Sequence, residues 1–203
     1  MKIICIGRNY ADHAKEMNAP LPSAPVFFMK PDTAMLPAGN PFYIPDFTND
    51  LHYECELVVK IKKAGKHIPE NFAGDYYDEI GLGIDFTARD LQTACKEKGL
   101  PWEIGKAFDN SAPMGTHFLP KTALNLADLT FTLHKNGELV QTGHTTDMIF
   151  SIDQLIAYVS QFITLKTGDL LFTGTPAGVG PVAIGDRLEG FIGEEKLLDL
   201  QIK

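Results

Sequence analysis

Cysteine is scarce in this chain, and its three cysteines lie far apart. Cys5, Cys55 and Cys95 form no C-x-x-C pair, and their number is odd. A disulfide framework or a zinc knuckle needs paired or closely spaced cysteines, so neither is expected. Unpaired cysteines are typical of a reducing compartment, and the chain is therefore predicted to be cytoplasmic.

Long apolar runs and clusters of basic residues are also missing. No apolar stretch approaches the roughly 20 residues that a membrane-spanning helix needs, and the first residues do not have the pattern of a signal or transit peptide. The 203 residues include 18 Lys and Arg against 26 Asp and Glu, a formal charge of −8, without a basic stripe. We therefore expect neither a membrane nor a nucleic acid as a partner.

Turn-forming residues, by contrast, are plentiful, with 18 glycines and 13 prolines. This content favours a strand-rich fold over a helix bundle. A length of 203 residues suffices for one full core, and no linker, repeat or low-complexity tract divides it. We expect an α+β, predominantly β fold in which residues 1–203 form a single domain.

Hydrophobic patterning places the individual elements. Strands are predicted at residues 2–6, 26–29, 51–61, 80–86, 129–134, 138–142, 170–173, 187–192 and 196–202. Helices are predicted at residues 12–17, from near residue 87 to 99, and after residue 151. Thr87-x-x-Asp90 and Ser151-x-x-Gln154 have the spacing of capping boxes. Asn136-Gly137 predicts a hairpin, because both turn positions favour positive φ.

Two glutamates and an aspartate form the first candidate site. Glu54 and Glu56 lie two residues apart in the predicted 51–61 strand, so their side chains share one face. Asp85 adds a third acid at the end of an apolar strand. Desolvated carboxylates repel one another, and hard cations such as Mg²⁺ or Mn²⁺ prefer oxygen ligands. The plainer alternative is a solvated strand face, with Asp85 capping a helix.

Other polar residues have the chemistry of a catalytic site. His13 and Glu16 share one helical turn if residues 12–17 are helical, and a carboxylate beside an imidazole suits a base that activates water. Lys106, among small and apolar residues, suits the stabilisation of an oxyanion. Arg89 and Gln92 lie three residues apart on the helix predicted after Asp85, and they suit the orientation of a carboxylate. Each interpretation has a plainer alternative. His13 and Glu16 could form a pair on the surface, and Lys106 could bury only its stem while its charge reaches water. Arg89 and Gln92 could belong to an ordinary helix surface.

The glycine-rich segment at residues 174–180 carries no nucleotide motif. It lacks the G-x-G-x-x-G spacing after a strand and the Lys-Ser/Thr of a phosphate loop. We interpret it as a backbone loop packed against another part of the molecule or against a ligand.

Seven short motifs follow one another over nearly the whole chain. They are GRNYADH at residues 7–13, FMKP at 28–31, HYECEL at 52–57, DFTARD at 85–90, KGLPW at 98–102, MIFSI at 148–152 and TGTPAGVG at 173–180. In this order they resemble the fumarylacetoacetate hydrolase family, in particular its short, single-domain acylpyruvase and oxaloacetate decarboxylase branch. Several motifs in register are far more specific than any one of them.

The resemblance assigns roles to the candidate residues. It implies metal ligands at Glu54, Glu56 and Asp85, a catalytic dyad at His13 and Glu16, an active-site lysine at Lys106, and substrate contacts at Arg89, Gln92 and Thr175. It also implies a mixed β-sandwich roll of the family's C-terminal-domain type with a few short helices, which is usually a homodimer. In this family the segment that bears the dyad closes over the site as a lid.

The function implied by the resemblance is hydrolysis that depends on Mg²⁺ or Mn²⁺. The substrates would be acylpyruvate-type 2,4-diketo acids, which are cleaved at a C–C bond to pyruvate and a carboxylic acid, with oxaloacetate decarboxylation as a further activity. His13, oriented by Glu16, would activate water, and Lys106 would stabilise the oxyanion, while the metal polarises the 2-keto acid. The partner is therefore a small 2-keto acid, and residues 1–203 form the catalytic domain.

Three alternatives remain open at this point. The same family includes isomerases and decarboxylases of dienoates from aromatic catabolism, which use the same carboxylates. A non-haem iron oxygenase is a second alternative, because His52-x-Glu54 has the spacing of two facial-triad ligands. Its third ligand would be His117, His134 or His144. The third alternative is a metal-binding module without catalytic activity.

Overall fold

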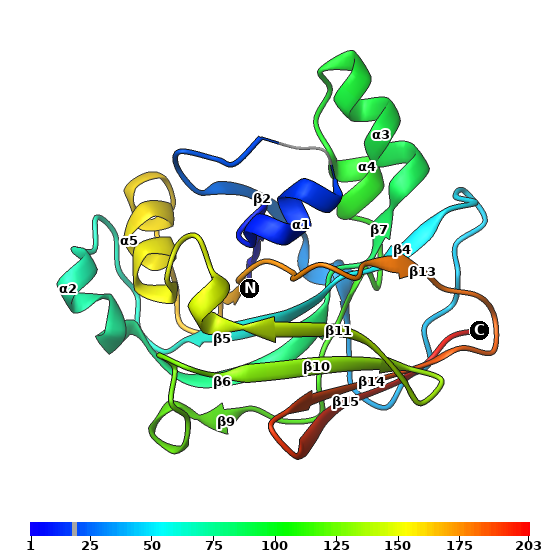
Figure 1. Cartoon of the computed structure of the whole chain (residues 1–203). Coiled ribbons are helices and arrows are strands. Elements are labelled where there is room, and N and C mark those ends of the chain that lie inside the picture. Colours follow the sequence, from blue (N-terminus) through cyan, green and yellow to red (C-terminus); the bar gives the residue numbers. More distant parts are fainter. Residues whose placement is uncertain (18–19) are drawn as a thin grey trace.

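A computed structural model describes residues 1–17 and 20–203 of the chain. Strands make up most of its regular structure, and the helices are short (Figure 1). The predicted α+β, predominantly β fold is therefore confirmed. In the described part of the chain, no helix is long and apolar enough to cross a membrane.

The elements have the following bounds. The strands are β1 (Ile3–Gly7), β2 (Val26–Lys30), β3 (Met35–Leu36), β4 (Leu51–Tyr53), β5 (Cys55–Ile61), β6 (Tyr77–Ile84), β7 (Thr87–Ala88), β8 (Ala112–Pro113), β9 (Leu119–Pro120), β10 (Thr130–Lys135), β11 (Glu138–His144), β12 (Leu170–Phe172), β13 (Gly180–Pro181), β14 (Arg187–Ile192) and β15 (Glu195–Gln201). The helices are α1 (Ala11–Glu16), α2 (Glu70–Ala73), α3 (Arg89–Lys98), α4 (Glu103–Lys106) and α5 (Ile152–Phe162), with single 3₁₀ turns η1 (Asp32–Ala34), η2 (Gly74–Tyr76), η3 (Lys121–Ala123) and η4 (Thr145–Asp147).

The largest sheet has the strand order β2-β1-β12-β5-β6-β9. Only β1 and β12 run parallel, and every other neighbouring pair is antiparallel. Six of the seven residues of β5 are buried, so this strand is covered on both faces. The site residues of β5 therefore lie in the middle of the molecule.

A second sheet, with the order β11-β10-β14-β15, packs against one face of the first. Leu57 and Leu82 of the first sheet and Phe131 and Leu198 of the second are fully buried in one cluster. A Cβ on Gly190 would lie 3.2 Å from Cδ1 of Leu82, so the glycine allows the close approach of the sheets. Figure 1 shows α1, α3 and α4 on the other side of β5 and β6.

Local signals in the sequence produced the predicted hairpin and one predicted cap. Asn136 and Gly137 have φ values of 55° and 84° and join β10 to β11. The Ser151 hydroxyl accepts from the backbone N–H of Gln154, and the Gln154 side chain accepts from that of Ser151, which completes the capping box of α5. Gly99, with φ 64°, ends α3 as predicted.

The predicted capping box at Thr87 is wrong. Helix α3 begins at Arg89, and its N-cap residue, Ala88, makes no capping hydrogen bond through its side chain. The Thr87 hydroxyl donates instead to Oε1 of Glu54 at 3.0 Å and to the carbonyl of Asp85 at 3.2 Å. A buried carboxylate from another strand is the stronger acceptor, so a tertiary contact replaces the local one.

The predicted continuous strand at 51–61 is also wrong. It is divided into β4 and β5, and Glu54 lies at the break between them. The strand predicted at 80–86 is longer at its start and ends at Ile84, so Asp85 follows β6 directly. Helix α4 was not predicted. Residues 18 and 19, which follow the helix predicted at 12–17, lie outside the described residues.

Candidate active site

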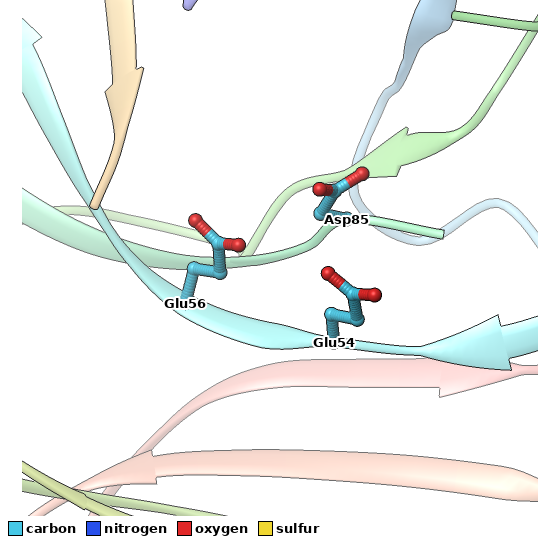
Figure 2. A group of neighbouring side chains, drawn as sticks. All are labelled: Glu54, Glu56 and Asp85. Atoms are coloured by element: carbon cyan, nitrogen blue, oxygen red, sulfur yellow. The ribbon is translucent and has the colours of Figure 1, made fainter. Parts of the chain in front are cut away.

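Three carboxylates converge beside the broken strand. Glu54 lies between β4 and β5, Glu56 lies within β5, and Asp85 follows β6. One oxygen from each lies within 4.8 Å of the others, and the three residues are at most 5% exposed. Figure 2 shows the three side chains on the same side of the strands that carry them. The sequence-based grouping of these acids is therefore found in the structure.

Backbone pairing fixes where these acids lie. Glu56 is the partner of Gly83 in the β5–β6 ladder, and the N–H of Asp85 donates to the carbonyl of Glu54 at 2.8 Å. A Cβ on Gly83 would lie 2.7 Å from the Phe172 ring, so only glycine fits opposite Glu56. The acids are thus held by the sheet and not by a flexible loop.

Buried cations lie against two of the three acids. Lys106 Nζ donates to Glu54 Oε2 at 2.9 Å and to Asp85 Oδ2 at 2.7 Å. Arg89 donates to Oε1 of Glu54, and Lys30 Nζ lies 2.8 Å from Oδ1 of Asp85. These three cations lie against Glu54 and Asp85, so the charges of these two acids are compensated within the described chain.

The charges shift the pKa values of the two glutamates in opposite directions. Burial alone would raise the pKa of Glu54, but Lys106 and Arg89 hold it well below its usual range. Burial raises the pKa of Glu56 well above its usual range, and the carboxylates of Asp85 and Glu54 raise it further. A divalent cation among the three acids would relieve this repulsion, so the donor set fits a hard metal ion.

Lys106 is held in its charged form. Burial alone would lower its pKa, but the carboxylates of Asp85 and Glu54 raise it above its usual value. The side chain is therefore suited to stabilising negative charge and not to accepting a proton.

The two members of the predicted dyad are in contact. His13 Nδ1 lies 3.2 Å from Oε2 of Glu16, and both residues belong to α1. Glu16 also accepts a hydrogen bond from the backbone N–H of Gly178 at 3.1 Å. The glycine-rich loop therefore supports α1 through Glu16. His13 lines the same cavity as the three acids.

Arg89 and Gln92 lie on one face of α3 and are joined by a 2.8 Å hydrogen bond. The Thr175 hydroxyl donates to the carbonyl of Cys55 at 2.9 Å. These three predicted substrate contacts line the same cavity as the acids. Of the predicted site residues, Glu16 alone does not line it, although its side chain contacts His13, which does.

The sequence analysis missed Lys30 and Gln141, two buried residues that contact residues of the site. Lys30 is 1% exposed and donates to the carbonyls of Phe86, Ser111 and Lys106 besides its contact with Asp85. A lysine at the end of an apolar strand was the available signal. Gln141, which is also buried, accepts from the N–H of Cys55 and donates to Thr175, and no local pattern marks it.

The structure does not bring the histidines of the iron-site alternative to Glu54. His52 Nε2 lies 2.8 Å from Asp50, His117 contacts Glu195, and His144 contacts Thr130. His134 packs against Phe191. In the described residues, the group with metal-ligand geometry consists of carboxylates alone.

Known proteins resemble this chain over almost its whole length. The family model described as "Fumarylacetoacetate (FAA) hydrolase C-terminal" matches residues 2–200. The mouse protein named oxaloacetate tautomerase FAHD1, mitochondrial, is 49% identical over 191 residues, which are 94% of this chain and 86% of that protein.

Two solved structures have the same fold. The fumarylpyruvate hydrolase of Pseudomonas aeruginosa, in complex with Mn²⁺ and pyruvate, has a TM-score of 0.93 at 40% identity and matches 100% of this chain and 89% of its own. The 5-carboxymethyl-2-hydroxymuconate delta-isomerase of Mycobacterium smegmatis has a TM-score of 0.87 at 32% identity, with 99% and 78% matched. The predicted mixed β-sandwich roll with a few short helices is therefore confirmed.

Proposed function

The chain belongs to the fumarylacetoacetate hydrolase family, and we propose that it is a divalent-metal-dependent enzyme that acts on oxaloacetate and related 2-keto acids. The observation that carries this proposal is the buried group of Glu54, Glu56 and Asp85, with His13 lining the same cavity. A buried acid group beside a base suits proton transfer next to a carbonyl.

We assign the metal to the three carboxylates. Glu54, Glu56 and Asp85 would hold Mg²⁺ or Mn²⁺, and the raised pKa of Glu56 supports this assignment because a cation there would offset a negative charge that burial and the two other acids disfavour. When bound, the ion supplies a Lewis acid that polarises the keto group of a 2-keto acid. The Mn²⁺ and pyruvate in the Pseudomonas hydrolase support the same kind of ligand pair.

The remaining residues bind the substrate and move protons. Arg89, Gln92 and Thr175 would orient a carboxylate, and Lys106, which stays charged, would stabilise a developing negative oxygen. His13, with its ring held by Glu16, would accept a proton from C3 of oxaloacetate during tautomerisation. The mouse relative's name favours this reaction as the first candidate.

Hydrolysis of acylpyruvates is the second candidate reaction. The His13–Glu16 contact favours it, because a base of this kind can also take a proton from water. The fumarylpyruvate hydrolase of known structure supports this reading. Isomerisation of dienoates needs no activated water, and it has the support of the mycobacterial isomerase only at lower identity.

The test is an assay of purified protein with Mg²⁺, with Mn²⁺ and with a chelator. The keto and enol forms of oxaloacetate are followed by ultraviolet absorbance, and acetylpyruvate and fumarylpyruvate are followed by their loss. We expect metal-dependent turnover that the chelator abolishes. Absence of turnover with every substrate in both metals would refute an enzymatic role.

We also propose that residues 1–203 act as one catalytic domain, that the protein is a homodimer, and that it is cytoplasmic. Sedimentation equilibrium and cell fractionation are the measurements that check the last two. The mouse relative carries a mitochondrial designation in its name, which applies to that protein.

A further inference from the structure

Two cations besides those at the acids line the cavity. Lys30, Lys106 and Arg89 already lie against the acids, whereas Arg8 and Lys96 make no ion pair within residues 1–17 and 20–203. The protein as a whole carries a formal charge of −8. Two uncompensated cations in one cavity of an acidic protein therefore indicate a place for an anion.

The backbone at Arg8 has an unfavourable conformation. Its φ is 62°, in the left-handed region that residues other than glycine seldom adopt. The next residue, Asn9, is fully buried, and its side chain donates to the carbonyls of Phe150 and Thr173. These bonds hold the exit of β1 in place, so the strain at Arg8 is maintained by the fold at the point where its residue lines the cavity.

Lys96 continues the functional face of α3. It lies seven residues after Arg89 and four after Gln92, so the three share one side of the helix. Seven residues correspond to about 10 Å along the axis, which places Lys96 toward the outer end of the cavity. Its ammonium lies 5.5 Å from the centroid of the Trp102 ring, and Trp102 packs on Phe28.

The lowered pKa of Lys96 agrees with a position near the other cations of the cavity. Partial burial lowers the pKa of Lys96 to about 8, and the positive charges of Arg89 and Arg8 lower it further. A helix C-terminus by itself attracts lysine, as Lys98 in the same last turn illustrates. Lys98, however, does not line the cavity, so the helix end does not explain why Lys96 does.

We propose that Arg8 and Lys96 form a subsite for the distal carboxylate of a dicarboxylic 2-keto acid. The inference rests on the proposed function, in which the keto acid end lies at Glu54, Glu56 and Asp85. Phe28 and Trp102 line the cavity as well and provide an apolar wall for the carbon chain. The enzyme should therefore select doubly charged substrates over acylpyruvates with an uncharged end.

The affinity of substrate analogues that are not turned over tests the subsite of Arg8 and Lys96. Calorimetry on the Mn²⁺-loaded protein compares 2-oxoglutarate with 2-oxopentanoate and 2-oxoadipate with 2-oxohexanoate. Each pair has the same chain length, and a methyl group replaces the distal carboxylate in its second member. We expect the dicarboxylate to bind about tenfold more tightly in at least one pair, as for a partly exposed ion pair.

The variants are Lys96→Met and Arg8→Asn, with Lys98→Met as the matched control. Asparagine tolerates positive φ, so Arg8→Asn removes the charge without adding strain. Each of the first two should reduce the preference about fivefold, and Lys98→Met should leave it unchanged. Equal affinity within both wild-type pairs, or a preference that survives both variants, would overturn the subsite alone. Failure of all four compounds to bind would overturn the proposed function as well.

Discussion

The backbone N–H of Gly174 donates a 2.7 Å hydrogen bond to Oε2 of Glu56. Within the described chain, this is the hydrogen bond that the carboxyl of Glu56 receives, whereas Glu54 and Asp85 each contact a lysine. Glu56 is thus the acid whose charge is least compensated before a metal binds. Its replacement should separate metal binding from folding.

Glu56→Gln should prevent metal binding and raise the stability of the metal-free protein. Burial raises the pKa of Glu56, so the protonated form stabilises the folded state at low pH, and this contribution is lost as the pH rises toward the folded pKa. At pH 8 in a chelator, the variant should melt a few degrees above wild type, since about 1 kcal/mol corresponds to 2–4 °C at this size.

Differential scanning calorimetry at pH 8 and near pH 4.5, with and without Mn²⁺, is the measurement. Mn²⁺ should raise the Tm of wild type and leave that of Glu56→Gln unchanged, and the metal-free difference should shrink at the lower pH. Glu79→Gln, at an exposed position beside Lys60, is the control. If Mn²⁺ raised the Tm of wild type and of Glu56→Gln equally, Glu56 would be excluded as a ligand.

Lys30→Met should destabilise the fold strongly. The buried Nζ contacts Asp85 and three carbonyls, and removal of one partner of a buried ion pair costs about 3–5 kcal/mol. Lys60→Met is the matched control, because Lys60 forms an exposed pair with Glu79 that contributes at most about 1 kcal/mol. Urea unfolding of both variants is the measurement. Similar midpoints for the two would show that Lys30 does not hold Asp85.

His13→Ala should change the ratio of two activities. A positioned base is typically worth about 10²–10⁴-fold, so acetylpyruvate hydrolysis should fall within that range. Oxaloacetate decarboxylation needs no activated water and should fall much less. Both rates are measured at one pH and metal concentration, and the ratio corrects for any general effect of α1 on the site. A ratio that is unchanged, or that shifts toward hydrolysis, contradicts the role of His13.

Glu16→Gln is the companion variant for the dyad. Its amide oxygen can still accept from the N–H of Gly178, so α1 should keep its position while His13 loses a charged partner. We expect hydrolysis to decline less than in His13→Ala. A decline as large as that of His13→Ala, with unchanged melting, would mean that His13 requires the negative charge of Glu16 and not only its hydrogen bond.

Dicarboxylate binding should weaken as the pH rises through about 8. The pKa of Lys96 is lowered to about 8, first by its partial burial and then by Arg89 and Arg8, so the free protein loses this charge in that range. The arginines stay charged, and the pKa of Lys106 is raised, so neither accounts for such a change.

The inhibition constant of 2-oxoglutarate between pH 7 and 9 is the measurement, with 2-oxopentanoate as the reference for pH effects at the metal. Lys96→Arg keeps its charge, and its profile should stay flat relative to the reference. A wild-type profile as flat as that of Lys96→Arg would be incompatible with a titrating lysine in the subsite.

Local chemistry determined how well the sequence predicted the structure. The Ser151 cap and the Asn136-Gly137 turn depend on neighbours at most three residues away, and both were predicted correctly. Thr87 has the same local spacing, but its hydroxyl bonds Glu54, which is 33 residues away. Strand alternation placed Glu54 and Glu56 on one face, yet it did not predict the break at Glu54.

Contacts between distant segments explain the missed site residues. Lys30 donates to the carbonyl of Ser111, 81 residues away, and Gln141 bonds Cys55, 86 residues away. Neither pairing follows from periodicity or turn chemistry, because it depends on which strands become neighbours. The subsite at Arg8 and Lys96 has the same origin.

The parallel pairing of β1 with β12 has a consequence for synthesis of the protein. The N–H of Lys2 bonds Asp169, 167 residues later in the chain. At about 5–20 residues per second, β1 leaves the ribosome roughly 10–30 s before its partner does. During that interval its apolar residues have β2 as their only neighbour in the sheet, an open edge that invites pairing with other chains. We therefore expect the sheet to be completed only when β12 has emerged, with β1 as the segment that most needs a chaperone until then.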